Sequence, residues 1–392
     1  MAKRIIDTPL LMTPIAHFSH AVRLGTTLHA GAIAGTDAAR RLAGDAPGLV
    51  DAVAQTQRMY DNLETTLALL DATVDDLVRL KVYVTDPRDI ARCDAVFRER
   101  YPRLGVTPTI VGSHGFPLPQ AAIELDAVAQ PGAASRTTMA VASGCGGVRA
   151  GDSLHLNVCP DAAAGTDAAD QCASLLARLE ALLAHAAMTP RDIVNLHLTV
   201  ADIRDAAIFD SALGRAYPAP YPSATVVAAP LPDPALRFQL EAVAIAGGGR
   251  PLSIDDGATA LAHASDAMLA GDVLYVSAQS GARGAHTPAD GAEGAESAQT
   301  QTHRAWARVT ALLAAAGLGI EHVLRTNNVL TDWRHYAGFN AGYGASTRRP
   351  YPNRATVLGG LSDPRACVHV EAIAHRDALA STVVEANGHE RA

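Results

Sequence analysis

Arg354 and His369 are the side chains in this sequence whose types and spacing are best suited to chemistry. Arg354 lies in the segment Tyr351–Val357, and His369 follows in the segment Val368–Ala374. A guanidinium binds a carboxylate through two charge-assisted hydrogen bonds that a lysine does not reproduce. A histidine, with an ordinary pKa of about 6.5, takes a proton from water at neutral pH. The pair therefore predicts a site that binds a small carboxylate and transfers a proton.

The segments that hold these two residues have counterparts at two earlier places in the chain. Pro222–Val227 runs on to Phe238–Ala244, and Thr107–Val111 runs on to Ile123–Ala129. Recurrence of the same segments in the same order is the signature of a tandem repeat. The sequence therefore predicts three copies of one module, with boundaries at residues 1–130, 135–247 and 252–378.

Each copy is predicted to contain the element order β-β-α-β-α-β-β. In the first copy, apolar residues at helical spacing predict a helix over residues 51–72, and an alternating pattern predicts a strand over residues 80–86. A second helix is expected near residues 88–100, and the last ~14 residues of the chain are expected to form a frayed tail. Because helices cover one face of each sheet, the other face is expected to pack against the sister copies.

The composition predicts a folded protein without nucleic-acid or membrane partners. Of 392 residues, 48% are apolar and 18% are charged, and the formal net charge of −8 comes without a basic patch. No secretory signal and no long uncharged apolar run is present. Five cysteines without a C-x-x-C pair argue against a disulfide framework and a structural zinc site, so a reducing, cytoplasmic location is expected. No cofactor and no metal are expected.

These motifs resemble the Rid (YjgF) family, the reactive-intermediate deaminases. The likeness is clearest in the first copy, in Asp75–Asp86 and Ile123–Ala129, and it covers nearly the whole chain three times. Single-module members of that family are homotrimers with ligand clefts between neighbours. The resemblance implies an α+β fold whose three modules form a pseudo-three-fold, pseudo-trimeric ring with the sheets facing inward. A monomeric pseudo-trimer is expected, and further self-association is left open.

The resemblance also assigns site residues, and the third copy matches best. In the family an arginine binds the substrate carboxylate, a glutamate positions the hydrolytic water, and a serine and an asparagine line the cleft. Arg354, Ser277 and Asn340 match these positions, whereas His369 stands in the glutamate position. His369 is therefore expected to act on the water, with Arg354 as its catalytic partner. Thr356, two residues after Arg354, completes the expected substrate-binding set in this copy.

The first two copies retain less of the pattern. The first copy keeps Glu124, which joins the expected substrate-binding residues, but its arginine position holds Thr109 or Ile110. The second copy has Ala224 and Gln239 and therefore neither key side chain. No single copy contains both the arginine and the glutamate.

The sequence as a whole predicts a cofactor-free hydrolase or deaminase that acts on a small carboxylate-bearing imine, enamine or related metabolite. Its main cleft is expected between the third copy and a neighbouring copy. Two other functions stay open: a chorismatase-like enzyme, whose fold is Rid-like, and a non-catalytic scaffold or metabolite sensor. In a purely structural alternative, Arg354 forms an ion pair with Glu371 or another acid.

Overall fold

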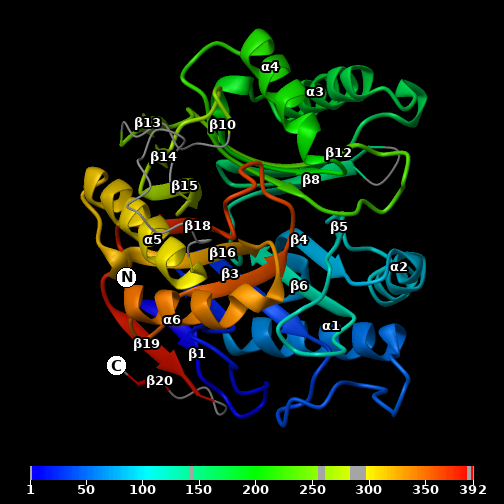
Figure 1. Ribbon diagram of the computed structural model, residues 1–392, viewed down its shortest axis with the longest axis vertical. Coiled ribbons are helices and arrows are strands. Elements are labelled where there is room, and N and C mark those ends of the chain that lie inside the picture. Colours follow the sequence, from blue (N-terminus) through cyan, green and yellow to red (C-terminus); the bar gives the residue numbers. More distant parts are fainter. Residues whose placement is uncertain (1, 142–144, 255–260, 283–296, 386–389, 392) are drawn as a thin grey trace.

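The computed structural model describes residues 2–141, 145–254, 261–282, 297–385 and 390–391, which form three modules of one plan (Figure 1). Module 1 contains β2 (Ala21–Leu24), β3 (Thr27–Ala34), α1 (Ala52–Leu69), β4 (Leu77–Val84), α2 (Ile90–Arg100), β5 (Thr109–Gly112) and β6 (Ile123–Ala129). Module 2 contains β8 (Cys145–Ala150), β9 (Ser153–Val158), α3 (Ala168–His185), β10 (Ile193–Val200), α4 (Ala206–Ala216), β11 (Ser223–Ala228) and β12 (Phe238–Ile245). Module 3 contains β14 (Ala267–Ala270), β15 (Val273–Ser280), α5 (Ala298–Ala315), β16 (Val323–Leu330), α6 (Tyr336–Ser346), β17 (Asn353–Leu358) and β18 (Val368–His375). The predicted order β-β-α-β-α-β-β is confirmed in all three.

The sheets share one strand order as well. It runs β5-β4-β6-β3-β2 in module 1, β11-β10-β12-β9-β8 in module 2 and β17-β16-β18-β15-β14 in module 3. The first pair of each series is parallel and the other pairs are antiparallel. The three modules are therefore repeats in structure as well as in sequence.

Further strands extend each sheet, and one of them corrects the expected frayed tail. They are β1 (Lys3–Ile6), β7 (Arg136–Val141), β13 (Arg250–Leu252), β19 (Ser381–Val384) and β20 (Glu390–Arg391). β19 pairs in parallel with β1, and Val384 is buried. Ser381–Val384 form an ordered strand because backbone pairing with β1 satisfies its hydrogen-bonding groups, whereas residues 386–389 and 392 of the expected tail lie outside the described residues.

The helices lie on the outside of the molecule and the sheets lie toward its middle (Figure 1). In α1, the side chains of Met59, Leu63 and Leu67 lie on one helical face and share a core with Leu125 and Ala127 of β6. Asp126, which lies between them on β6, faces the inner side of the sheet, because successive side chains of a strand alternate between faces. Within the described ranges, no helix combines the length and the apolar composition that crossing a bilayer requires.

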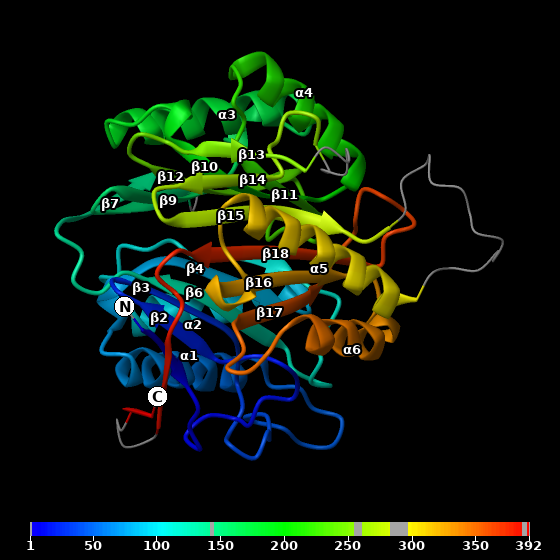
Figure 2. The same cartoon turned by 90° about the vertical axis from the view of Figure 1, so that its left-hand side faces the viewer.

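Each module packs against both others through its inner face and its edge strands (Figure 2). β17 of module 3 contacts β3 of module 1, β11 of module 2 contacts β15 of module 3, and β4 of module 1 contacts β8 and β9 of module 2. Backbone hydrogen bonds repeat at two of these junctions, from Ser19 to Pro352 and from Ser265 to Pro222. The contacts thus run from module 1 to 2 to 3 and back to 1.

Buried ion pairs join the modules in the same cyclic sense. A carboxylate on the last strand of each module (β6, β12 or β18) contacts a basic side chain on the third strand of the preceding module (β16, β4 or β10). The ion pairs are Asp126–Arg325 at 2.7 Å and Glu241 with Arg79 and Lys81 at 2.8 Å each. At the third junction Glu371 lies 3.4 Å from His197, whose pKa is lowered by burial, so this contact is not a full ion pair at neutral pH. Burial alone would raise the pKa of Glu241, but the charges of Arg79 and Lys81 hold it well below its ordinary value. Glu241 is therefore ionised in the folded protein at neutral pH.

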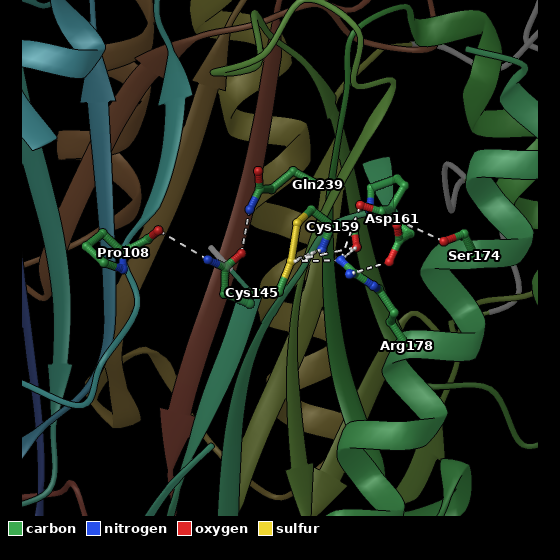
Figure 3. The surroundings of a disulfide bond; sticks show 9 residues. Pro108, Cys145, Cys159, Asp161, Ser174, Arg178 and Gln239 are labelled. Atoms are coloured by element: carbon green, nitrogen blue, oxygen red, sulfur yellow. Dashed lines mark hydrogen bonds and ion pairs between the residues drawn. A yellow bond between two sulfur atoms is a disulfide. The ribbon is translucent and has the colours of Figure 1, made fainter. Parts of the chain in front are cut away.

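One disulfide, between Cys145 and Cys159, is present, although the cysteine content argued against a disulfide framework (Figure 3). β8 and β9 form a hairpin in which Gly146 pairs with Asn157, so the two cysteines are brought close and their Cα atoms are 6.1 Å apart. A separation of 14 residues has no recognisable signature in the sequence, because strand pairing alone creates the contact. The cysteine content therefore does not support the expected reducing compartment.

Glu241→Gln should destabilise the fold far more than the loss of a surface ion pair. The substitution leaves Arg79 and Lys81 buried without a counter-charge, which typically costs about 3–5 kcal/mol. The matched control is Asp86→Asn, which removes the partner of Arg88 at the surface and keeps an amide that can cap the same turn. Urea-induced unfolding of both variants measures the difference, and equal loss of stability would show that the buried pairs do not hold the modules together.

Candidate functional site

Arg354 is buried on β17 beneath α6, with only 3% of its surface exposed. Its Nε donates to Thr356 Oγ1 at 3.0 Å, and its Nη2 donates to the Tyr336 hydroxyl at 3.4 Å. The guanidinium also lies against aromatic rings of α6, with Cζ 4.7 Å from the Tyr343 centroid and 4.9 Å from that of Phe339. Nη1 has no hydrogen-bond partner among the described residues. One edge of the guanidinium is thus fixed by the protein and the other is free.

No acid within the described part of the chain forms an ion pair with Arg354. Glu371, the partner considered in the structural alternative, lies instead beside His197. Burial lowers the pKa of Arg354, while Tyr343 and Tyr336 act in the opposite direction. A buried cation without a counter-ion is costly, and aromatic faces offset only part of that cost. The arrangement is typical of a site that receives an anion.

Strand alternation and helix periodicity explain how these side chains meet. Arg354 and Thr356 share a face of β17 with Leu358, which packs in the same core as Tyr343 of α6. Asn340 lies four residues after Tyr336, on the helical face that covers the arginine. The structure therefore brings together three of the expected residues: Arg354, Thr356 and Asn340.

His17 of module 1 completes this cleft, and sequence reasoning did not identify it. Its ring meets the edge of the Tyr351 ring with centroids 5.2 Å apart. A Cβ at Gly344 of α6 would lie 2.6 Å from the His17 ring, so the helix approaches this closely only with glycine there. Burial and the charges of Arg354 and Arg349 lower the pKa of His17, which keeps the ring neutral at pH 7.

The junction between modules 2 and 3 contains residues equivalent to His17 and Asn340. Between modules 2 and 3, His263 meets Tyr221 as His17 meets Tyr351, and its Nδ1 lies 3.2 Å from a carboxylate oxygen of Asp210. Asp210 is the fifth residue of α4 and Asn340 is the fifth residue of α6. Both Asn340 Oδ1 and His17 Nδ1 are buried without a hydrogen-bond partner among the described residues. Asn340 and His17 thus occupy the positions that Asp210 and His263 hold at the other junction.

Ser277 does not lie with Arg354, although both belong to module 3. Its hydroxyl donates to the Ser265 carbonyl at 2.6 Å and accepts from the Ala224 N–H at 2.8 Å. This is the junction of modules 2 and 3, whereas Arg354 faces module 1. The residue that takes the place of Ser277 beside β17 is Gly31 of module 1, where a Cβ would lie 3.1 Å from Asn353 Oδ1.

His369 and Arg354 lie on opposite faces of one sheet, so they do not share a cleft. His369 is in register with Val329 of β16 on the inner face, while its neighbours Val368 and Val370 pack under the helices. Burial lowers the pKa of His369 to about 4, and its Nδ1 has no hydrogen-bond partner among the described residues. The alternation of side chains along β18 is the physical reason for the separation.

Glu124 lies on the inner face of module 1. It is buried on β6, where it pairs in register with Tyr83 of β4. Burial, with Asp126 nearby, raises its pKa to about 8. At neutral pH the carboxyl group is therefore mostly protonated. No hydrogen bond or ion pair connects it to Arg354 within the described residues.

Strand register also corrects the arginine position of module 1. Thr109 pairs with Lys81 as Ala355 pairs with Asn327, so Thr109 corresponds to the residue after the arginine position. The position itself holds Pro108, rather than Thr109 or Ile110. A proline cannot bind a carboxylate through a side-chain donor.

Comparison with known proteins gives short matches, which cover about one module, and a long match, which covers most of the chain. The family model described as Endoribonuclease L-PSP matches residues 9–131 and 256–376, which together are more than half of the chain. The RutC family protein y4sK of Sinorhizobium fredii is 30% identical over 123 residues, which cover 31% of this chain and 94% of the relative. A YjgF family protein of Neisseria meningitidis is 26% identical and covers 29% of this chain and 88% of its own, with a TM-score of 0.25.

A longer match is to a crystal structure of a chorismatase. It is 15% identical and covers 76% of this chain and 93% of its own, with a TM-score of 0.56. At this identity the likeness concerns the fold alone. The short relatives thus correspond to one module, and the chorismatase corresponds to most of the chain.

The charge of Arg354 should be measurable at His17. Replacing Arg354 by Met removes one of the causes that lower the His17 pKa, so that pKa should rise toward its ordinary value. NMR titration of the imidazole nitrogens measures the change, with a His17→Gln spectrum for assignment. His375 is the internal control, because its pKa is lowered by burial and responds to the charges of Asp377 and Asp272 rather than to that of Arg354. An unchanged His17 pKa would show that the two side chains do not share a cleft.

Proposed function

The chain belongs to the Endoribonuclease L-PSP family, and we propose that it is a cofactor-independent hydrolase of the Rid (YjgF) type. The resemblance to that family and the fold of three α+β modules are confirmed. The proposed substrate is a small carboxylate-bearing imine, enamine or related metabolite, bound between modules 3 and 1. One observation carries the proposal: the buried guanidinium of Arg354 has a free Nη1 and no acid partner among the described residues.

The substrate carboxylate would bind the free edge of Arg354. Among the described residues, Nη1 has no competing acceptor and Nη2 makes only a long hydrogen bond to Tyr336. Thr356 fixes Nε, so little rotamer freedom is lost when the ligand binds. The bound carboxylate supplies the counter-charge that the folded protein lacks at this position.

Imine hydrolysis then requires a water and a group that moves its proton. Water adds to the carbon of the C=N bond, a proton passes from that water to the nitrogen, and the C–N bond breaks to leave a carbonyl compound and ammonia. The neutral ring of His17 is suited to accept the proton through its free Nδ1 and return it to the leaving nitrogen. Asn340 Oδ1 provides an acceptor that holds the water.

This proposal transfers the proton-moving role from His369 to His17. His369 lies on the inner face of its sheet, and its pKa of about 4 makes it a weak base at neutral pH. Glu124 is mostly protonated at that pH and is therefore unsuited to accept a proton. Of these three side chains, only His17 lies beside Arg354 and is also suited to accept a proton at neutral pH.

Arg354→Ala should weaken both ligand binding and turnover. Loss of one charge-assisted contact is worth about 1.5–3 kcal/mol, which corresponds to roughly 10–100-fold in affinity. Hydrolysis of 2-iminopropanoate, followed by pyruvate release, measures turnover, and the shift in melting temperature with pyruvate measures binding. Arg354→Lys should restore little of either, because an ammonium does not reproduce the planar two-pronged contact.

The control variant is Arg204→Ala, which removes an exposed arginine of module 2 and should change neither measurement. Acids that bind through Arg354 without any turnover by the wild type would favour a carboxylate sensor over a hydrolase. Equal turnover by wild type and Arg354→Ala would refute the proposed site.

A further inference from the structure

A cavity of about 600 Å³ lies where the inner faces of the three modules meet. We call it the central chamber. Its floor is polar, and its wall includes Arg79 and Glu241 at one junction and Arg325 at another. Its rim is formed by hairpin turns of the three modules, among them residues 26–27, 151–152 and 271–272. Arg354 does not line it, so the chamber is separate from the cleft described above.

The arginines of the chamber wall are balanced by carboxylates of the protein, and the wall also contains the carboxylate of Glu371, whose Oε2 has no hydrogen-bond partner among the described residues. Glu241 neutralises Arg79 at 2.8 Å, and Asp126 neutralises Arg325 at 2.7 Å. A carboxylate ligand would therefore find no arginine without a counter-ion in the wall, in contrast to the free edge of Arg354. A carboxylate ligand would lose its hydration without gaining an unpaired cation, and the negative charge of Glu371 would repel it.

Neutral polar groups of the chamber wall, by contrast, lack partners. His29 is 5% exposed, His155 is 9% exposed and Asn327 is 8% exposed. His29 Nδ1, both ring nitrogens of His155 and Asn327 Oδ1 have no hydrogen-bond partner among the described residues. Burial lowers the pKa of both histidines to about 3, so both rings are neutral near pH 7. Leaving such groups unsatisfied costs stability, which a bound molecule would recover.

The wall toward the rim is largely apolar. Val128, Val148, Val243 and Ile373 line it, one or more from each module, together with the ring of Tyr275. A mostly apolar pocket with a few convergent polar groups is the usual form of a small-molecule site, and cavities of this size hold molecules of a few hundred daltons. The chamber thus offers hydrogen bonds at its depth and apolar contact above them.

We propose that the central chamber is a second ligand site, which binds a small uncharged molecule with hydrogen-bonding groups at one end and an apolar body. His155 and His29 bond the polar end, and Asn327 accepts from its N–H or O–H. The valine side chains and Tyr275 contact the body. Because the wall holds no free cation, this ligand differs in class from the carboxylate assigned to Arg354.

The test uses nicotinamide and benzamide as uncharged probes and nicotinate as the charged match. Titration calorimetry on the wild type should show one site for an uncharged amide and a preference for nicotinamide over nicotinate at that site. His155→Phe keeps the ring volume but removes both unpartnered nitrogens, so amide binding should weaken about tenfold or more. Thr27→Trp places a large side chain at the rim and should block entry.

The stability of His155→Phe separates this result from misfolding. Since no hydrogen bond is lost in the unliganded protein, its melting temperature should be equal to or higher than that of the wild type. Neither variant touches the cleft of Arg354, so hydrolysis of 2-iminopropanoate should be the same in both, and failure of that activity leaves the chamber test intact. Binding of neither amide at millimolar concentration, or binding that both variants leave unchanged, would overturn the proposal.

Discussion

The buried ion pair between Arg325 and Asp126 is the contact on which the geometry of the proposed active cleft depends. It joins β16 of module 3 to β6 of module 1 at 2.7 Å. Arg325 Nη1 also donates to Asn353 Oδ1, and the Asn353 amide donates to the Ser19 carbonyl at 3.0 Å. Asn353 precedes the cleft arginine on β17, and Ser19 follows His17 by two residues. The pair therefore sets how closely His17 approaches Arg354, although it touches neither.

Joining three modules in one chain allows equivalent positions to hold different residues. The position of Arg354 holds Ala224 in module 2 and Pro108 in module 1. At the junction of modules 2 and 3, the hydroxyl of Ser277 accepts a hydrogen bond from the Ala224 N–H. The position equivalent to Arg354 therefore takes part in a hydrogen bond between the modules. A homotrimer would repeat any such change in all its clefts. Here one cleft keeps the anion-binding group while another serves the packing of the modules.

Local patterns in the sequence predict the elements and part of the site, whereas contacts between modules escape them. The order of strands and helices follows from periodicity, and Arg354 and Thr356 meet because they are two residues apart on a strand. His17 is brought to them only by packing of module 1 on module 3, for which no local pattern exists. The expectation that His369 joins Arg354 fails because side chains alternate along β18, which puts His369 on the inner face of the sheet and Arg354 on the other. The disulfide of Cys145 depends on hairpin pairing and is likewise invisible in the spacing.

Charge balance distinguishes the two sites more clearly than size or position does. Arg354 is a buried cation with no acid beside it among the described residues. Binding of an anion beside it would therefore stabilise the folded protein. In the central chamber each arginine has its own carboxylate, and the groups without hydrogen-bond partners among the described residues include neutral ones such as His155 and one oxygen of Glu371, but no cation. Without a ligand, each site destabilises the folded protein for its own reason. The Arg354 cleft lacks a counter-charge, and the central chamber lacks hydrogen bonds. Since each cost is relieved by a different chemical class, the two ligands should bind without competing.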